Sequence, residues 1–184
     1  MRERPTKDVR EKFLEASFGY LTENGLDNIS LRELGKKTGI SLGSVYYWFE
    51  GKDGLIISAA EYGLGKVAEQ IFDYAFKNMN DMKAFFGSCI EEISKYKMQL
   101  RFIYQIATSP IYGEWMRSRA DELNCLYESY AEKLSKLLGC SVEEMEPLVY
   151  MFIAIILDYV VWDDLEKTKL QLNYIYKLFA NLSK

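Results

Sequence analysis

The segment SLRELGKKTGISLGSVYYWFEGKDGL, residues 30–55, decides how the N-terminal part of this chain folds. Its pattern predicts two short helices. Ser30 caps the first, with Glu33 as its partner in a capping box, and Ser41 caps the second. Gly39 stands between them, where the chain has to reverse and glycine adopts a positive φ at little cost. Apolar side chains at helical spacing bury both helices against a preceding one, so the segment is typical of a helix-turn-helix.

The remainder of the chain predicts helices alone, because it contains only three prolines and no long alternation of apolar and polar residues. A first helix is expected from after Pro5, capped by Thr6, to about Asn24. Further helices are expected at about 53–78, 81–98, 100–108, 113–138, 143–163 and 167–182, the first of them weakened by Gly63 and Gly65. The predicted fold is all-α, with a three-helix helix-turn-helix domain over residues 1–52 and a larger helical domain over residues 53–184.

The charge of the chain is unevenly distributed. The formal net charge is −4, yet residues 1–54 contain nine basic and nine acidic side chains, so the remainder carries the whole excess. A neutral domain binds DNA only if its cations face one way, and modest non-specific affinity is expected. Arg2, Arg4 and Lys7 are expected to form either a basic arm or a disordered tail.

The composition excludes most catalytic and metal-dependent functions. The chain has no histidine, which removes the commonest general base and the commonest metal ligand together. Cys89, Cys125 and Cys140 are isolated, and they indicate buried thiols in a reducing compartment rather than a zinc site or disulfides. We therefore expect no catalytic residues, no metal, no cofactor and no enzymatic activity.

The sequence also predicts a cytoplasmic protein that does not cross a membrane. The N-terminus lacks the apolar region of a signal peptide. The apolar run Leu148–Trp162 is interrupted by Asp158 and is shorter than the roughly 20 residues that a bilayer requires.

The second short helix offers a surface suited to DNA. Its exposed face is expected to carry Ser41, Leu42, Gly43, Ser44, Tyr46 and Tyr47. Small residues at its start let the backbone approach base edges, while hydroxyls and N-terminal amides suit phosphate oxygens. Lys52 adds a cation near the DNA backbone. Alternatively, Tyr46, Tyr47 and Trp48 close a small core and contact no DNA.

A resemblance favours the DNA-binding interpretation. Residues 30–34, 39–41 and 43–47, together with Phe49, Lys52 and Leu55, resemble the N-terminal domain of the TetR family of transcriptional repressors. The resemblance implies a homodimer with a recognition helix at Ser41–Trp48. It also implies groove contacts from Leu42, Gly43 and Ser44, and phosphate contacts from Ser30, Tyr46, Tyr47, Trp48 and Lys52, with Arg32 as a further DNA-binding candidate. Two positions depart from the family pattern, since Trp48 stands where histidine is usual and Leu42 where a cation is common.

For the larger domain, the resemblance implies an effector site and dimerisation through the last two helices, 143–163 and 167–182. The first offers Leu148, Val149, Phe152, Ile156 and Val160, and the second offers Leu170, Tyr174, Ile175, Leu178 and Phe179. A four-helix bundle across a two-fold axis accounts for this excess of apolar side chains, and a monomer with a thick core is the alternative.

The effector is expected to be a small apolar or aromatic molecule. The side chains expected to contact it are aromatic, apart from one methionine and one carboxylate. Aromatic side chains at helical spacing also occur in ordinary cores. The candidates are Phe86, Tyr96, Phe102, Tyr104, Trp115, Tyr127, Tyr130, Met151, Asp158 and Trp162. Asp158 requires a partner, which is either a cationic group on the effector, Arg117 or Arg119, or a helix end across the dimer.

The sequence thus predicts a homodimeric repressor that binds a near-palindromic double-stranded DNA operator and is released by its effector. The sequence leaves open the opposite response, in which the effector promotes DNA binding. The alternative function is a helical protein-interaction module that never touches DNA.

Overall fold

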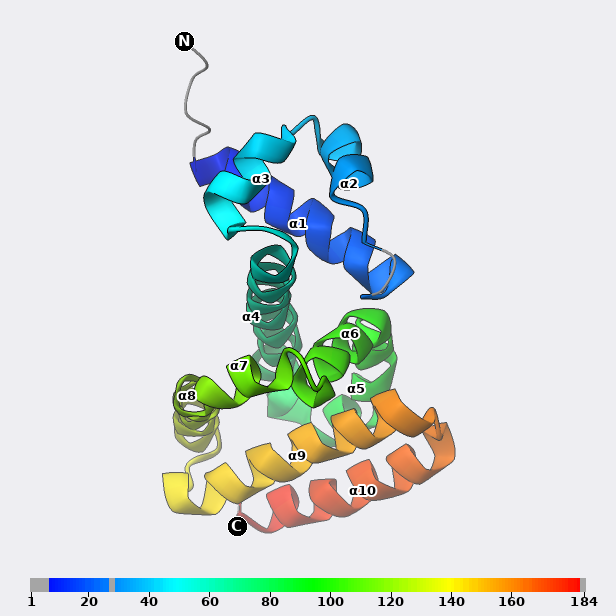
Figure 1. The fold of residues 1–184 in the computed structure, drawn as a ribbon. Coiled ribbons are helices and arrows are strands. Elements are labelled where there is room, and N and C mark those ends of the chain that lie inside the picture. The colour runs from blue at the N-terminus through cyan, green and yellow to red at the C-terminus, as the bar shows by residue number, and fades with distance from the viewer. Residues whose placement is uncertain (1–6, 27–28, 183–184) are drawn as a thin grey trace.

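The computed structural model describes residues 7–26 and 29–182, and all of its regular elements are helical (Figure 1). The predicted all-α fold is confirmed. In chain order the helices are α1 Lys7–Asn24, α2 Leu31–Thr38, α3 Leu42–Phe49, α4 Lys52–Asn78, a short 3-10 turn Met79–Asp81, α5 Met82–Ser94, α6 Lys97–Thr108, α7 Gly113–Ser118, α8 Ala120–Leu138, α9 Val142–Trp162 and α10 Leu165–Leu182. The predicted Thr6 cap and the arm residues Arg2 and Arg4 lie outside the described residues.

Local capping interactions set the bounds of α2 and α3. The Ser30 hydroxyl accepts from the backbone N–H of Glu33 at 3.3 Å, and Gly39 ends α2 with φ 73°. The predicted capping box is only half formed, because the Glu33 carboxylate accepts a hydrogen bond from the Tyr20 hydroxyl at 3.0 Å. Ser41 caps α3 by accepting from the Ser44 N–H at 3.2 Å. Both cap positions read from the sequence are thus occupied as expected.

The core of the N-terminal part forms where α1 meets α2 and α3. Phe13, Leu34 and Val45 are fully buried there, and Phe13 stacks on Phe49 with ring centroids 5.8 Å apart. Burial of large apolar side chains is the main source of stability in such a small core. The α3 helix is therefore held by its inner face and leaves its outer face uncovered.

Helix α4 joins the two parts of the molecule without interruption, although Gly63 and Gly65 predicted a weakened middle (Figure 1). A Cβ on Gly63 would lie 2.0 Å from the Phe18 ring, so this glycine lets α1 approach α4 closely. A Cβ on Gly54 would lie 1.8 Å from the Phe49 carbonyl oxygen, where the end of α3 crosses the start of α4. The N-terminal helices are thus seated directly on α4.

The larger part packs α9 against α8, α10 and α6, and α10 also packs against α5. Its core is rich in aromatic rings; Phe86, for example, contacts Phe152 and Phe179 with ring centroids 6.2 and 5.4 Å apart. The 21-residue α9 extends beyond the apolar run Leu148–Trp162 and is, by length and composition alone, long and apolar enough to cross a membrane. Seven of its side chains are buried within the protein, which is equally typical of a core helix.

Candidate functional site

The outer face of α3 is exposed at the N-terminal end of the molecule. Tyr46 and Tyr47 are 56% and 71% exposed, Leu42 is 40% exposed, and Gly43 leaves the backbone of the first turn uncovered. The hydroxyls of Ser41 and Ser44 lie 2.9 Å apart and cap this turn. The structure therefore brings these predicted contact residues together on one surface.

Trp48 differs from its neighbours because it is half-buried. Its ring lies 6.4 Å from that of Phe13 and meets the Phe49 ring edge-on at 6.0 Å. The indole thus closes part of the small core, which was the alternative considered for it, while part of it stays accessible. The Arg10 guanidinium lies 5.1 Å from the Phe49 ring centroid, so α1 places a cation beside the end of α3.

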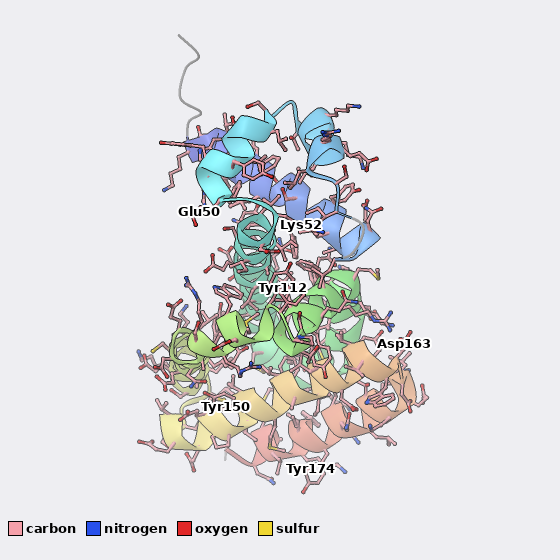
Figure 2. The ribbon with its side chains drawn as sticks, in the orientation of Figure 1. Glu50, Lys52, Tyr112, Tyr150, Asp163 and Tyr174 are labelled. Atoms are coloured by element: carbon pink, nitrogen blue, oxygen red, sulfur yellow. The ribbon has the colours of Figure 1, made fainter. Side chains whose placement is uncertain are left out.

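The remaining candidates flank α3. Ser30 is the N-cap of α2, and Arg32 is exposed as the second residue of that helix. Lys52 is exposed as the first residue of α4, just after Glu50 ends α3 with φ 60° (Figure 2). These groups surround the α3 surface with hydrogen-bond donors and two cations.

A separate cavity lies in the larger part, enclosed by α4, α6, α7, α8 and α9, with a volume of about 260 Å³. Of the predicted effector contacts, Tyr104 and Tyr127 line it. The other walls are mostly aliphatic, and they include Val67, Ile103 and Ile156. An emphasis on aromatic residues missed this lining. The only signal for it was the apolar periodicity of α4 and α6, which a plain core shares.

The other predicted effector contacts lie elsewhere. Phe86 and Phe102 are core residues, Tyr130 stacks on Phe72 with centroids 3.5 Å apart, and Tyr96 and Trp115 are partly buried near the ends of α6 and α7. Trp162 is 71% exposed at the end of α9, and Met151 lies on the outer side of that helix. Each of these side chains therefore lies outside the cavity, either packed in the core or exposed to solvent.

Asp158 has found a partner within its own chain. The Lys167 ammonium lies 2.8 Å from its carboxylate, and Gln171 donates a hydrogen bond at 3.5 Å. The hydrogen bond from Lys167 holds the pKa of Asp158 below its ordinary value. The partners considered from the sequence are therefore replaced by Lys167, and Arg119 instead pairs with Glu61 at 2.9 Å. Because Asp158 is only partly buried, the expectation of an expensive buried charge was wrong.

The outer faces of α9 and α10 together form an open apolar groove. Its lining is Met151, Ala154, Ile155, Leu170, Gln171, Tyr174 and Ile175. Leu170 and Tyr174 are 72% and 61% exposed, and Tyr174 points outward from α10 in Figure 2. The residues expected for association on α9 are instead buried inside the protomer: Leu148, Val149, Phe152, Ile156 and Val160. Helical periodicity gave two apolar faces on α9, and the sequence did not show which one faces inward.

Comparisons with known proteins match the N-terminal part most clearly. Residues 13–59 match the family model of the bacterial regulatory proteins of the tetR family. The chain is 36% identical over 66 residues to the HTH-type transcriptional regulator YvdT of Bacillus subtilis, covering 36% of this chain and 34% of YvdT. It is 23% identical over 138 residues to the HTH-type transcriptional repressor AcnR of Corynebacterium glutamicum, covering 73% of this chain and 68% of AcnR. The chain spans about a third of the length of the first two curated relatives that it matches.

Solved structures share the fold over almost the whole chain. A tetR-family transcriptional regulator from Streptomyces coelicolor superposes with a TM-score of 0.63 at 12% identity, covering 97% of this chain and 82% of that one. A TetR transcriptional regulator from Legionella pneumophila gives 0.60 at 14% identity, with both chains fully covered. The local sequence match and the shared fold agree: residues 13–59 match the bacterial regulatory proteins of the tetR family, and the whole chain has the fold of TetR-family transcriptional regulators.

Proposed function

We propose that this protein is a homodimeric transcriptional repressor that inserts α3 into the major groove of a near-palindromic operator and is released by a small-molecule effector. The observation that carries the proposal is the exposed outer face of α3, whose inner face is fixed by Val45 and Phe49. Rigid support of a short exposed helix is what groove reading requires. As a regulator of bacterial genes, the protein would act in the cytoplasm.

The small residues at the start of α3 suit close approach to base edges. Gly43 has no side chain to hold the helix away, and Leu42 offers an apolar contact for a thymine methyl group. Tyr46, Tyr47 and Lys52 would donate to phosphates, and Ser30 and Arg32 at the start of α2 would fix the register on the duplex. Trp48 would contribute through its accessible edge while its other side supports Phe13.

Effector control is supported by the shared walls of the cavity. Helix α4 lines the cavity through Val67 and also begins at Lys52 beside α3. Helix α6 lines it through Ile103, and one residue away Phe102 contacts Phe18 of α1 with centroids 5.8 Å apart. An effector that favours one arrangement of these helices changes operator affinity only through its different affinity for the two arrangements.

The test is fluorescence anisotropy of the purified protein with labelled fragments of its upstream genomic DNA, in parallel with random DNA at several salt concentrations. The wild-type protein is expected to prefer one fragment, and its affinity for DNA should fall as the salt concentration rises. Tyr47→Ala removes a solvated side chain and Ser44→Arg places a bulky cation at the groove, so both should lower affinity for that fragment at least tenfold without changing the melting temperature. Met98→Ala on α6 is the control, because it removes an exposed side chain that lies outside both α3 and the α9–α10 groove, and it should leave operator affinity unchanged.

Two outcomes would contradict the proposal. If no fragment is preferred over random DNA, the protein does not read sequence. If Tyr47→Ala and Ser44→Arg bind like wild type, the outer face of α3 is not the reading surface, and the neutral N-terminal charge then favours a protein-interaction module.

A further inference from the structure

The cavity between α4 and α9 has walls of unusually uniform chemistry. None of the described residues that line it carries a charge, and the only polar side chains among them are Tyr104 and Tyr127. The charged residues of neighbouring α4 turns, Lys66 and Glu69, line a separate open groove against α8 instead. A charged ligand would therefore lose its hydration in this cavity without gaining a counter-charge, at a large cost in free energy.

The two tyrosines provide the specific polar groups. Within the described residues, neither the Tyr104 nor the Tyr127 hydroxyl makes a hydrogen bond to another protein group. Tyr127 is fixed from behind by Tyr150, whose ring meets it edge-on at 5.7 Å. Burial, followed by the influence of Tyr150, raises the pKa of Tyr127, so this phenol keeps its proton at neutral pH and can donate it. A donor on the cavity wall without a protein partner favours ligands that accept its hydrogen bond over ligands that do not.

The volume limits the size of the occupant. An engineered apolar protein cavity of about 150 Å³ holds benzene, with its six carbons. Scaling to the 260 Å³ found here gives room for about ten non-hydrogen atoms.

We propose that this cavity binds an uncharged, largely apolar molecule of about ten non-hydrogen atoms that carries one hydroxyl or carbonyl oxygen, bonded by Tyr104 or Tyr127. That this molecule is the effector rests on the proposed function, whereas binding in the cavity does not. This molecule replaces the cationic effector that Asp158 first suggested, since that carboxylate is paired with Lys167.

The experiment uses four probes built on one ring system: naphthalene, 2-naphthol, 2-naphthoate and 2-naphthylmethylammonium. Binding to the full chain at pH 7 is measured by calorimetry and by the shift in melting temperature. Naphthalene and 2-naphthol are expected to bind, with 2-naphthol about 2- to 10-fold tighter because it makes one more neutral hydrogen bond. Both charged probes are expected to bind at least tenfold more weakly than naphthalene.

Variants locate the site. The double variant Tyr104→Phe, Tyr127→Phe should bind naphthalene as wild type does and lose the advantage of 2-naphthol. Ala107→Phe fills the cavity and should abolish binding, while Ala84→Phe makes the same change at an exposed position of α5 and should not. If Ala107→Phe fails to fold, Ala68→Leu on the α4 wall fills the cavity with a smaller side chain.

The inference is overturned if either charged probe binds as tightly as 2-naphthol, if none of the four probes binds, or if Ala107→Phe and Ala68→Leu, both folded, bind like wild type. Operator binding is measured separately on the same preparations. If the probes bind but no operator does, the proposed function is wrong and the cavity assignment stands. If an operator binds but no probe does, the cavity assignment is wrong and DNA binding stands.

Discussion

Gly63 and Gly65 lie two residues apart on α4 but have different surroundings. A Cβ on Gly63 would collide with the ring of Phe18, which is itself held against Phe102, whereas a Cβ on Gly65 would meet nothing within 4 Å. The first glycine therefore permits close packing, while the second only lowers helix propensity.

Alanine at these two positions should accordingly have opposite effects. Gly63→Ala should lower the free energy of unfolding by about 1–3 kcal/mol, since an extra carbon in a packed seam forces side chains out of position. Gly65→Ala should raise it by about 0.5–1 kcal/mol through helix propensity alone. Urea denaturation followed by circular dichroism measures both, and effects of the same sign would show that the seam is looser than described.

The three cysteines should differ in reactivity. Cys89 is buried and its pKa is raised to about 12 by burial, whereas Cys125 is exposed, contrary to the expectation that all three thiols are buried. At pH 8 about one Cys89 in ten thousand is a thiolate, the form that reacts. In a thiol–disulfide reagent assay on the folded protein, Cys125 should react rapidly and Cys89 only after urea is added. Loss of the fast phase in Cys125→Ser identifies it, and a fast Cys89 would contradict this packing.

At the scale of single residues, the sequence predicts what depends on near neighbours. Ser30 and Ser41 were identified as caps because a cap bonds to an N–H three residues along the chain. Glu33 and Asp158 were assigned the wrong partners because Tyr20 and Lys167 reach them from other helices, through the way those helices pack.

Among the elements, the corner between α6 and α7 connects the cavity to the start of α4. The Tyr112 hydroxyl donates to the Asp53 carboxylate at 2.7 Å, bridging 59 positions of sequence. Figure 2 places Tyr112 where α6 and α7 meet, below the end of α3. Asp53 is also in the first turn of α4, where a negative charge is favourable.

Tyr112→Phe should therefore weaken the link between effector and DNA. Loss of one hydrogen bond to a charged group is expected to cost about 1.5–3 kcal/mol of stability. The Kd of 2-naphthol should stay nearly constant, while its effect on operator affinity should shrink. Titrating operator binding with and without 2-naphthol measures the change. Tyr74→Phe is the control, since it also removes a hydroxyl that makes a hydrogen bond, here with Ser88 at 2.8 Å, outside both the cavity and α3. An undiminished effect would assign the coupling to α4 and α6 alone.

The turn between α9 and α10 carries two ion pairs, Asp158 with Lys167 and Asp163 with Lys97. Hydrogen bonds from these lysines hold the pKa of each carboxyl below its ordinary value of 3.8. The unfolded chain therefore binds protons at a higher pH than the folded protein. The stabilisation is present above about pH 4 and is lost as the pH falls through the lower folded values.

Melting temperatures between pH 3 and pH 6 test this linkage. Lys167→Met should flatten the acid side of the curve, because Asp158 then titrates more nearly as it does in the unfolded chain. Lys169→Met is the matched control, since Lys169 pairs with the exposed Glu166 at 3.1 Å and should leave the curve unchanged. Identical slopes in wild type and Lys167→Met would show that the pair contributes nothing to acid stability.

At the scale of elements, periodicity predicted the helices well and the cavity poorly. Apolar repeats and stops such as Gly25 and Gly39 mark helices in one dimension. The cavity is a space left between five helices. An apolar residue such as Val67 or Ile103 fits the same helical periodicity whether it packs against a neighbour or lines that space. Only Tyr104 and Tyr127 among the proposed contacts lie on its wall.

Across the whole molecule, α3 and the α9–α10 face lie at opposite ends, with α4 leading from one part into the other (Figure 1). At 1.5 Å per residue, the 27 residues of α4 extend over about 40 Å. Dimerisation through α9 and α10 would leave both α3 helices uncovered on the far side. To read two half-sites, such a dimer would need its two α3 helices centred about 34–36 Å apart.

The apolar groove between α9 and α10 is the surface through which we propose that the dimer forms. Replacing Leu170 and Tyr174 together by aspartate puts charges onto two side chains that the protomer itself leaves exposed, so the fold should survive and self-association should not. Light scattering should give twice the 21.4 kDa chain mass for wild type and a single chain mass for the double variant. Operator affinity should fall at least about 100-fold, because each half-site then binds on its own.

Met98→Asp makes a similar change at another exposed apolar side chain and should keep both the dimer and the affinity. A double variant that stays dimeric would move the interface away from this face, and a monomer that binds the operator undiminished would show that the two half-sites are read independently.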